Sequence, residues 1–326
     1  MRKTELYGKA DVIFKTFWRQ NDRFASLFNT VIFGGKEVVK PEALEEMDTD
    51  ISNTLTFGKY KETLARTRDV VKKAVYGIGF VVMGIENQQE IHYAMPLRVM
   101  IYDSLGYLKE FQEIVKHHRK TGDLSSTGEF LTGMCQEDRL HPIISIVIYY
   151  NESPWDGPVC LKDMVIKMPR EIEQAFSDYK MNLLQVSASE QYQFQNEDVQ
   201  TAFETARYLY QGAFDKVQKQ LGNRKIPSDV GAMIGVMTNS KLLIEEAIES
   251  RGRIDMCTAL EQLAKKGEAR GIEIGKARGI HLGEQRAKKE IAIRLSDHGM
   301  KLMEIAGVLD EKEETVKEWL KNSTVD

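Results

Sequence analysis

The chain has 326 residues and a formal net charge of −4, with 45 Lys and Arg against 49 Asp and Glu. This balance excludes a strongly basic protein, so any affinity for nucleic acid must come from a local patch. The length allows a buried core and about two domains. The cysteines, Cys135, Cys160 and Cys257, are widely spaced and form no metal-ligand pattern. We expect a reduced, cytoplasmic protein without a signal peptide. No apolar run approaches the roughly 20 residues of a membrane helix.

The N-terminal segment is predicted to be helical. Over residues 9–33, apolar side chains such as Phe14, Phe17 and Trp18 recur at spacings of three and four, which indicates one or two amphipathic helices. The next segment gives a weaker signal, with one strand indicated around 51–57.

Two apolar runs, 69–75 and 80–88, flank a Tyr-Gly-Ile-Gly tetrapeptide and predict a tight β-hairpin. Glycine tolerates the positive φ that a two-residue turn demands. With the two central residues as the turn, Asp69 lies directly opposite Glu86, and their Cβ atoms are about 5 Å apart. Gln88 lies two residues beyond Glu86 and therefore faces the same side of the sheet.

Two carboxylates at this separation repel and destabilise a bare sheet, unless a cation lies between them. Mg²⁺ binds one or two carboxylates and otherwise water and phosphate oxygens. The hairpin therefore predicts a small Mg²⁺ site for phosphate chemistry, with Asp69 and Glu86 as ligands. Two alternatives stay open. The acids could be solvated at the strand ends, or a three-residue loop could turn one of them to the opposite face.

A helix and a strand follow the hairpin. Pro96 suits the first turn of a helix that is predicted to run to about Lys120. Arg98 and Tyr102 share one face of this helix and could clamp a phosphate. The alternative is a core tyrosine beside a structural arginine. Residues 142–150 form the clearest buried strand in the sequence.

From residue 171 onward the apolar spacing is helical, so we expect four parts: a mixed α/β domain, a helical region, a long glycine-spaced helix and a small helical tail. Their boundaries are 1–168, 169–254, 255–296 and 297–326.

Glycine recurs every four residues from Gly267 to Gly283 in the third part. Because glycine costs a helix about 1 kcal/mol each, the stripe suggests close approach of a second helix and thus self-association. A flexible charged linker is the alternative.

The tail has the spacing of a helix-turn-helix unit. The possible recognition helix of this unit begins with Asp310, Glu311, Glu313 and Glu314, whose negative charges would repel phosphates. We therefore expect it to contact protein or to cap the chain rather than to recognise DNA.

Several short motifs follow one another in an order that resembles one protein family. They are Lys9-x-Asp11-x-x-Phe14-Lys15, Arg68-Asp69, Ile85-Glu86-Asn87-Gln88, His92-Tyr93-x-Met95-Pro96-x-Arg98-x-x-x-Tyr102-Asp103, Pro142 with its strand, and Trp155-x-Gly157-Pro158. Together they resemble the recombination-promoting nuclease (Rpn) family, also known as YhgA-like transposases, of the PD-(D/E)XK nuclease superfamily. The resemblance covers residues 5–165 closely and the C-terminal part less specifically.

The resemblance implies an α/β fold (an α+β mixed sheet) with a restriction-endonuclease-like core and a helical C-terminal extension. It implies metal-dependent cleavage of DNA, linked to recombination or mobile elements, with Mg²⁺ as cofactor and Mn²⁺ as a substitute. Asp69 and Glu86 match the superfamily's metal-binding acids. Asp11 resembles its N-terminal acid ligand, and the alternative for Asp11 is a helix cap or surface acid.

Gln88 stands where the superfamily usually has a catalytic lysine. Glutamine can orient water by hydrogen bonds but brings no charge. Lys73 and Lys72 lie along the hairpin, and Lys73 is the better candidate for the missing charge because it shares the parity of Asp69. The histidines show no metal-ligand spacing with these acids and are interpreted as structural.

A metal-dependent DNA endonuclease, which could self-associate through 255–296, is the leading functional hypothesis. The alternative is a catalytically weak or inactive DNA-binding or scaffold protein that retains the nuclease fold, as Gln88 and the acidic net charge would suit. Nothing in the residues indicates the integrase-like strand transfer that the name transposase implies. An RNA nuclease stays open, because no residue pattern reports on a 2′-hydroxyl.

Overall fold

The computed structural model describes residues 3–47, 53–57, 60–64, 69–76, 79–221, 224–250, 252–255, 276, 279 and 283–321. The chain divides into two compact units, Met1–Ala259 and Leu260–Asp326. Each unit is described by itself.

The larger unit is a mixed α/β fold around a five-stranded sheet with the order β1-β4-β5-β6-β7. These strands are β1 (Leu44–Glu46), β4 (Val70–Tyr76), β5 (Gly79–Gln88), β6 (Ile143–Tyr149) and β7 (Asn182–Gln185). The first three are antiparallel neighbours, whereas β5, β6 and β7 are parallel. The carboxyl ends of the three parallel strands therefore meet at one edge of the sheet, where open α/β sheets commonly bind ligands.

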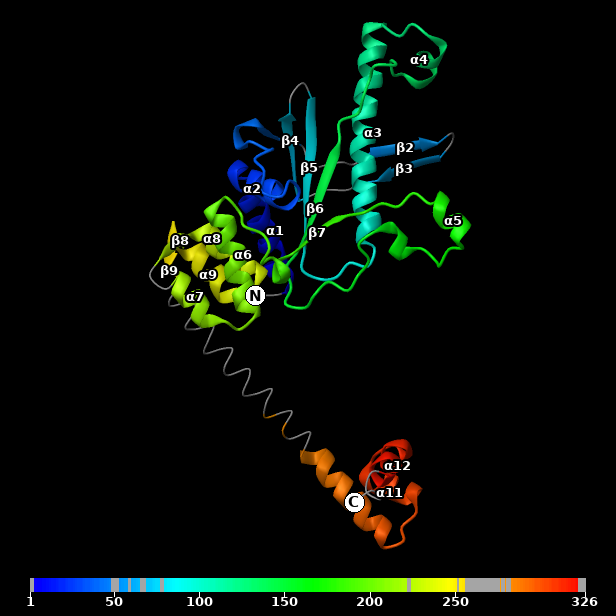
Figure 1. The fold of residues 1–326 in the computed structure, drawn as a ribbon, viewed down its shortest axis with the longest axis vertical. Coiled ribbons are helices and arrows are strands. Elements are labelled where there is room, and N and C mark those ends of the chain that lie inside the picture. Colours follow the sequence, from blue (N-terminus) through cyan, green and yellow to red (C-terminus); the bar gives the residue numbers. More distant parts are fainter. Residues whose placement is uncertain are drawn as a thin grey trace. The chain divides into compact units, whose positions relative to one another are not determined.

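One face of the sheet is covered by α1 (Lys3–Arg19) and α2 (Asn21–Val31), as Figure 1 shows. The amphipathic helices predicted from the apolar spacing are confirmed, because the apolar side chains are buried and Trp18 is fully buried. Lys72 of β4 points to this face, where its ammonium lies 5.1 Å from the ring centre of Phe24. Because side chains alternate along a strand, the residues of odd number in β4 face the other side.

The other face is covered by α3 (Met95–Thr121), which is the helix predicted to begin at Pro96 (Figure 1). Val99 of this helix packs against Val147 of β6 in a buried cluster. Glu86 is the Cα partner of Val147 in the parallel β5–β6 pair, so it points to the α3 face as well.

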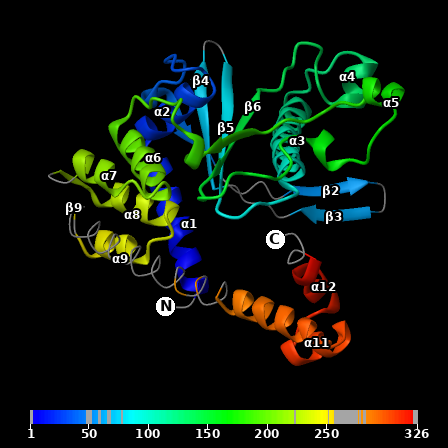
Figure 2. The same ribbon diagram turned by 60° about the horizontal axis from the view of Figure 1, so that its bottom comes forward.

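Four further helices, α6 to α9, gather beside α1, as Figure 2 shows, and α8 contacts α1, α6 and α9. They are α6 (Glu197–Tyr210), α7 (Phe214–Leu221), α8 (Ser228–Met237) and α9 (Lys241–Glu249), accompanied by the strand pair β8 (Lys225–Pro227) and β9 (Arg253–Asp255).

Shorter elements complete the unit. They are η1 (Pro41–Ala43), the hairpin of β2 (Asn53–Phe57) and β3 (Tyr60–Leu64), α4 (Thr127–Thr132), η2 (Leu161–Met164), α5 (Arg170–Ala175) and η3 (Val186–Ala188).

The region 169–254, predicted to be helical, also contains the strand β7. This strand of four residues is too short to show an alternating pattern, and it is held by parallel pairing with β6. Residues 169–254 also do not form a compact unit of their own, because α6 and α8 pack on the helices of the N-terminal segment.

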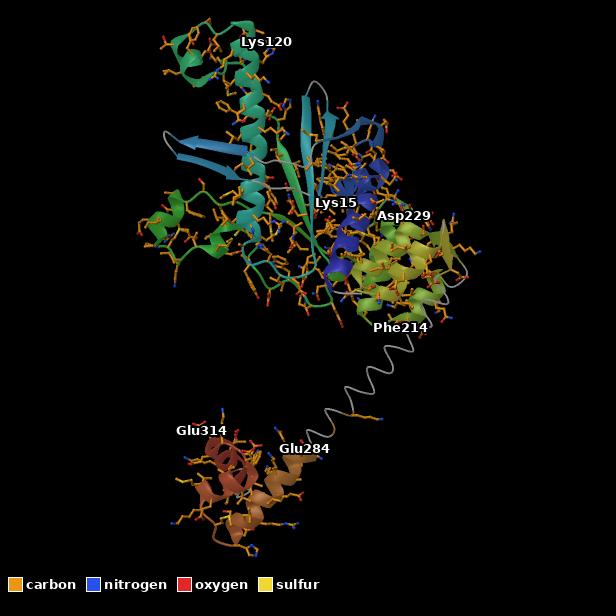
Figure 3. The ribbon with its side chains drawn as sticks, turned by 180° about the vertical axis from the view of Figure 1, so that it is seen from behind. Lys15, Lys120, Phe214, Asp229, Glu284 and Glu314 are labelled. Atoms are coloured by element: carbon orange, nitrogen blue, oxygen red, sulfur yellow. The ribbon has the colours of Figure 1, made fainter. Side chains whose placement is uncertain are left out.

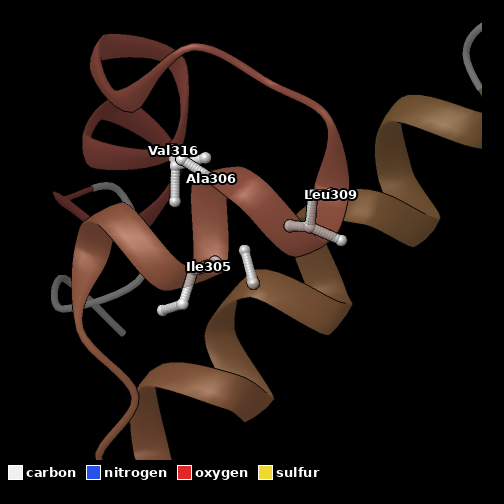
Figure 4. Packing of buried hydrophobic residues seen from close by; sticks show 5 residues of the cluster. Ile305, Ala306, Leu309 and Val316 are labelled. Atoms are coloured by element: carbon white, nitrogen blue, oxygen red, sulfur yellow. The ribbon is translucent and has the colours of Figure 1, made fainter.

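The described part of the C-terminal unit is mainly helical, as its apolar spacing predicted. Residues 283–297 are helical, followed by α11 (Leu302–Leu309) and α12 (Glu313–Lys321). Their shared core, shown in Figure 4, consists of Ala292, Ile305, Ala306, Leu309 and Val316. The first turn of α12 carries the acids Glu313 and Glu314, as the sequence indicated.

The predicted glycine stripe lies largely outside the described residues, which include only Gly279 and Gly283 of its five glycines. At both, a Cβ would meet no atom of the described part within 4 Å. Self-association through 255–296 therefore stays a prediction. Among the described helices, none has the length and apolar character needed to cross a membrane.

Candidate active site

The hairpin register agrees with the sequence prediction. The Cα partners run from Val70 opposite Ile85 toward the turn, whose residues 77–78 lie outside the described part. Asp69 directly precedes β4, and Glu86 lies on β5 one position beyond the last paired residue. The two predicted metal ligands therefore meet at the end of the ladder.

Asp69 is anchored by the neighbouring strand. Its Oδ2 accepts hydrogen bonds from the backbone N–H of Asn87 at 2.8 Å and from Asn87 Nδ2 at 3.2 Å. Burial is the main cause that raises the pKa of Asp69, and the negative charge of Asp11 adds to it. The hydrogen bonds from Asn87 and the charge of Lys15 act in the opposite direction. A cation at this position would stabilise the carboxylate form.

α1 brings two charges to this site. Lys15 Nζ donates to Asp11 Oδ2 at 2.9 Å, and Figure 3 labels Lys15 on α1. Both charges act on Asp69. The sequence prediction placed Asp11 near the metal ligands but missed Lys15. The signal that could have found it is the spacing of four residues, which puts both side chains on one face of a helix.

Glu86 is almost completely buried, with 1% of its side chain exposed, and its Oε2 lies 3.4 Å from Arg98 Nη2. Arg98 Nε donates a hydrogen bond of 2.8 Å to the hydroxyl of the buried Tyr102. Burial by itself lowers the pKa of Arg98, but the charge of Glu86 and the contact with Tyr102 outweigh it, so that pKa is raised. Arg98 and Tyr102 thus lie beside the carboxylates, as a phosphate clamp requires. The ion pair between Arg98 and Glu86 and the burial of Tyr102 also suit the alternative of a core tyrosine beside a structural arginine.

Gln88 and Lys73 differ in their distance from the acids. Gln88 is half-buried, lies two residues beyond Glu86 on the same face, and its carbonyl accepts a hydrogen bond from Tyr150 N–H at 3.0 Å. Lys73 is four strand residues from Asp69, which corresponds to about 13 Å. The structure therefore does not bring the backbone of Lys73 to the carboxylates.

Lys72, the other lysine considered for the missing charge, points away from the site. Its Nζ donates to Asn21 Oδ1 at 2.6 Å on the opposite face of the sheet. Burial lowers the pKa of Lys72 to about 8. The charge of Lys15, by contrast, acts on Asp69 and lowers its pKa.

A pocket of about 330 Å³ adjoins the Arg98 side of the cluster. It is lined by His92, Ala94, Leu97, Arg98, Ile101 and Tyr102. An arginine and a tyrosine at its wall, next to apolar side chains, suit a phosphate together with part of a sugar or base.

The donor set of the cluster suits a hard divalent cation. Asp69, Glu86 and Asp11 offer carboxylate oxygens only, which are the ligands that Mg²⁺ and Mn²⁺ prefer. In addition, Asn87 Oδ1 is buried and accepts no hydrogen bond from any described residue. An amide oxygen of this kind can bind a cation or a water of its hydration shell.

The fold and the site thus define a mixed α/β protein with a carboxylate cluster near the carboxyl edge of its parallel strands. No protein-family model, curated protein or solved structure matches the chain.

Proposed function

We propose that the protein is a metal-dependent DNA endonuclease with a PD-(D/E)XK core, of the recombination-promoting nuclease (Rpn) type, acting in the cytoplasm on recombining or mobile DNA. The observation that carries this proposal is the meeting of Asp69 and Glu86 at the end of the β4–β5 ladder. The charges of Asp11 and Lys15 act on the first acid, and Arg98 pairs with the second. Three acids and two cations at one sheet edge suit phosphodiester hydrolysis.

In this function Asp69 and Glu86 hold Mg²⁺, with Asp11 as a further ligand. Mg²⁺ bound there would polarise a phosphate oxygen and lower the pKa of a bound water. Gln88 orients the attacking water through its amide group, because it cannot supply a charge. Arg98, fixed by the Tyr102 hydroxyl, presents its planar donors to the DNA phosphate.

Purified protein incubated with supercoiled plasmid and Mg²⁺, Mn²⁺ or EDTA tests the proposal. We expect nicked and linear products with either metal and none with EDTA. Plasmid that stays intact in all three conditions would contradict the endonuclease activity. A parallel reaction with single-stranded RNA separates DNA cleavage from the RNA alternative.

In this function Lys15 supplies the positive charge that a lysine at position 88 would bring and that Gln88 does not. Lys15→Met removes the ammonium and keeps the apolar stem, so we expect the cleavage rate to fall about 100-fold, as for loss of one electrostatic group near a reacting centre. Lys15→Arg keeps the charge and should retain most activity. Lys36→Met, at an exposed position, serves as the control. Equal rates for all variants would remove Lys15 from the mechanism.

One observation favours the alternative of a non-catalytic DNA-binding scaffold. The ion pair with Arg98 already gives the buried Glu86 a cation. Such a pair stabilises the carboxylate without a metal. Mg²⁺ binding separates the two functions. Saturable stabilisation of the protein by Mg²⁺ that Glu86→Gln loses supports the endonuclease, and its absence supports the scaffold.

We further propose that the segment 255–296 makes the protein a homo-oligomer. Removing the chain beyond Ala259 keeps β9 and the whole first compact unit, so this truncation tests the segment without cutting into that unit. We expect its mass in light scattering to fall to that of one chain, whereas the full-length protein has a multiple of its chain mass. The same number of subunits in both would contradict self-association through this segment.

A further inference from the structure

A second group of metal-ligand side chains lies at the far end of α3. His118, Cys135 and Asp138 each offer one ligand atom, and these atoms lie within 4.8 Å of one another. The imidazole has a carboxylate on each side, with Nδ1 2.7 Å from Asp123 Oδ1 and Nε2 2.8 Å from Asp138 Oδ2. Cys135 Sγ lies 3.7 Å from Nδ1.

This cluster is separate from the candidate active site. His118 follows Arg98 by 20 residues on the same helix, which corresponds to about 30 Å. Figure 3 labels Lys120 at this end of α3 and Lys15 near the sheet. A ligand bound here therefore does not take part in the reaction proposed above.

We propose that His118, Cys135 and Asp138 bind one divalent cation of the zinc class. Imidazole nitrogen, thiolate sulfur and carboxylate oxygen together form a donor set typical of Zn²⁺, whereas Mg²⁺ takes oxygen ligands. One ring nitrogen of His118 binds the ion. The other keeps its N–H on the carboxylate of Asp123, which is the arrangement that orients metal-binding histidines.

The spacing of the residues supports the site. Cys135 and Asp138 are separated by two residues, as in the ligand pairs of many structural zinc sites. The backbone already holds them together, because Cys135 N–H donates to Asp138 Oδ2 at 2.7 Å. His118 enters from the end of α3, so that an ion would join the helix to the segment that follows it.

This segment has no apolar core of its own. From residue 121 to 142 no apolar side chain is buried, and Phe130 and Leu131 of α4 are 68% and 83% exposed. Small segments without a core are ordinarily held by a metal or by disulfides. Because Cys135 is a free thiol and forms no disulfide, a bound metal is the means by which this segment would be held.

Cobalt titration of the full-length protein tests the site. After removal of metals with EDTA, one equivalent of Co²⁺ is expected to produce a thiolate-to-cobalt charge-transfer band, which Zn²⁺ then bleaches. Cys135→Ser should abolish the band. Cys160→Ser, at the second free cysteine of the described residues, and Asp69→Asn, at the candidate active site, should retain it. No band in the unmodified protein, or an equal band in Cys135→Ser, overturns the proposal.

The two aspartates give a second, graded test. Asp123→Asn and Asp138→Asn are each expected to lower the affinity for Zn²⁺, by about 10- to 100-fold for the one that only orients His118 and by more for the ligand. Unfolding temperatures in EDTA verify that the variants fold. Unchanged Zn²⁺ affinity in both overturns the proposal. None of these readouts requires DNA cleavage, so they hold whether or not the nuclease function does.

Discussion

Replacing Asp69 by asparagine or Glu86 by glutamine is expected to lower the rate of Mg²⁺-dependent plasmid nicking by about 1,000-fold. Each change keeps the shape of the side chain and removes one negative charge from the metal ligands. Charge stabilisation by a bound metal contributes several kcal/mol to such reactions, and each 1.4 kcal/mol is a factor of ten in rate. The conversion of supercoiled to nicked plasmid, followed on agarose gels, measures the effect.

Glu90→Gln is the matched control for these two variants. Glu90 is exposed and lies two residues beyond the end of β5, so the change removes one negative charge near this end of the strand without altering a residue of the cluster. We expect a rate close to that of the unmodified protein. In Asp69→Asn the amide oxygen of the new side chain can still accept the hydrogen bonds that Asn87 donates, so folding should persist. Cleavage at the original rate in both active-site variants would exclude the hairpin acids.

Arg23→Ala is expected to have the largest effect on stability, a loss of about 3 kcal/mol. The side chain is 7% exposed and joins three helices, with Nη2 2.6 Å from Asp198 Oδ2 on α6 and Nη1 2.5 Å from Asp229 Oδ2 on α8. Its guanidinium also lies 4.4 Å from the ring centre of Phe17. Removing one partner of a buried ion pair costs about 3–5 kcal/mol. We expect the lower end, because both aspartates are partly exposed.

Arg224→Ala provides the comparison, since Arg224 pairs with Glu197 on the surface, where 56% and 72% of the two side chains are exposed. Such pairs contribute less than about 1 kcal/mol. Urea unfolding of both variants measures the difference. A loss of about 3 kcal/mol is a large part of the roughly 5–15 kcal/mol of a typical domain. Equal losses would show that burial of the Arg23 network contributes nothing.

The sequence by itself determined the elements that depend on neighbouring residues. The hairpin register follows from the glycines around a two-residue turn and from two β-rich runs, because a tight turn fixes which residues face each other. Local sequence signals also predicted the helix that begins near Pro96, from proline in its first turn, and the buried strand at 142–150, from its apolar run. The packing of the C-terminal helices followed from apolar spacing of three and four.

Only the tertiary structure decided which distant residues meet. The four-residue strand β7 has no pattern of its own and exists because β6 offers a parallel partner. The charge of Lys15 acts on Asp69, and Arg98 pairs with Glu86, because α1 and α3 pack on the sheet. The approach of Cys135 to His118 depends in the same way on how the chain returns after α3. Local propensity acts over a few residues, whereas these contacts join residues 12 to more than 50 positions apart, so packing alone brings them together.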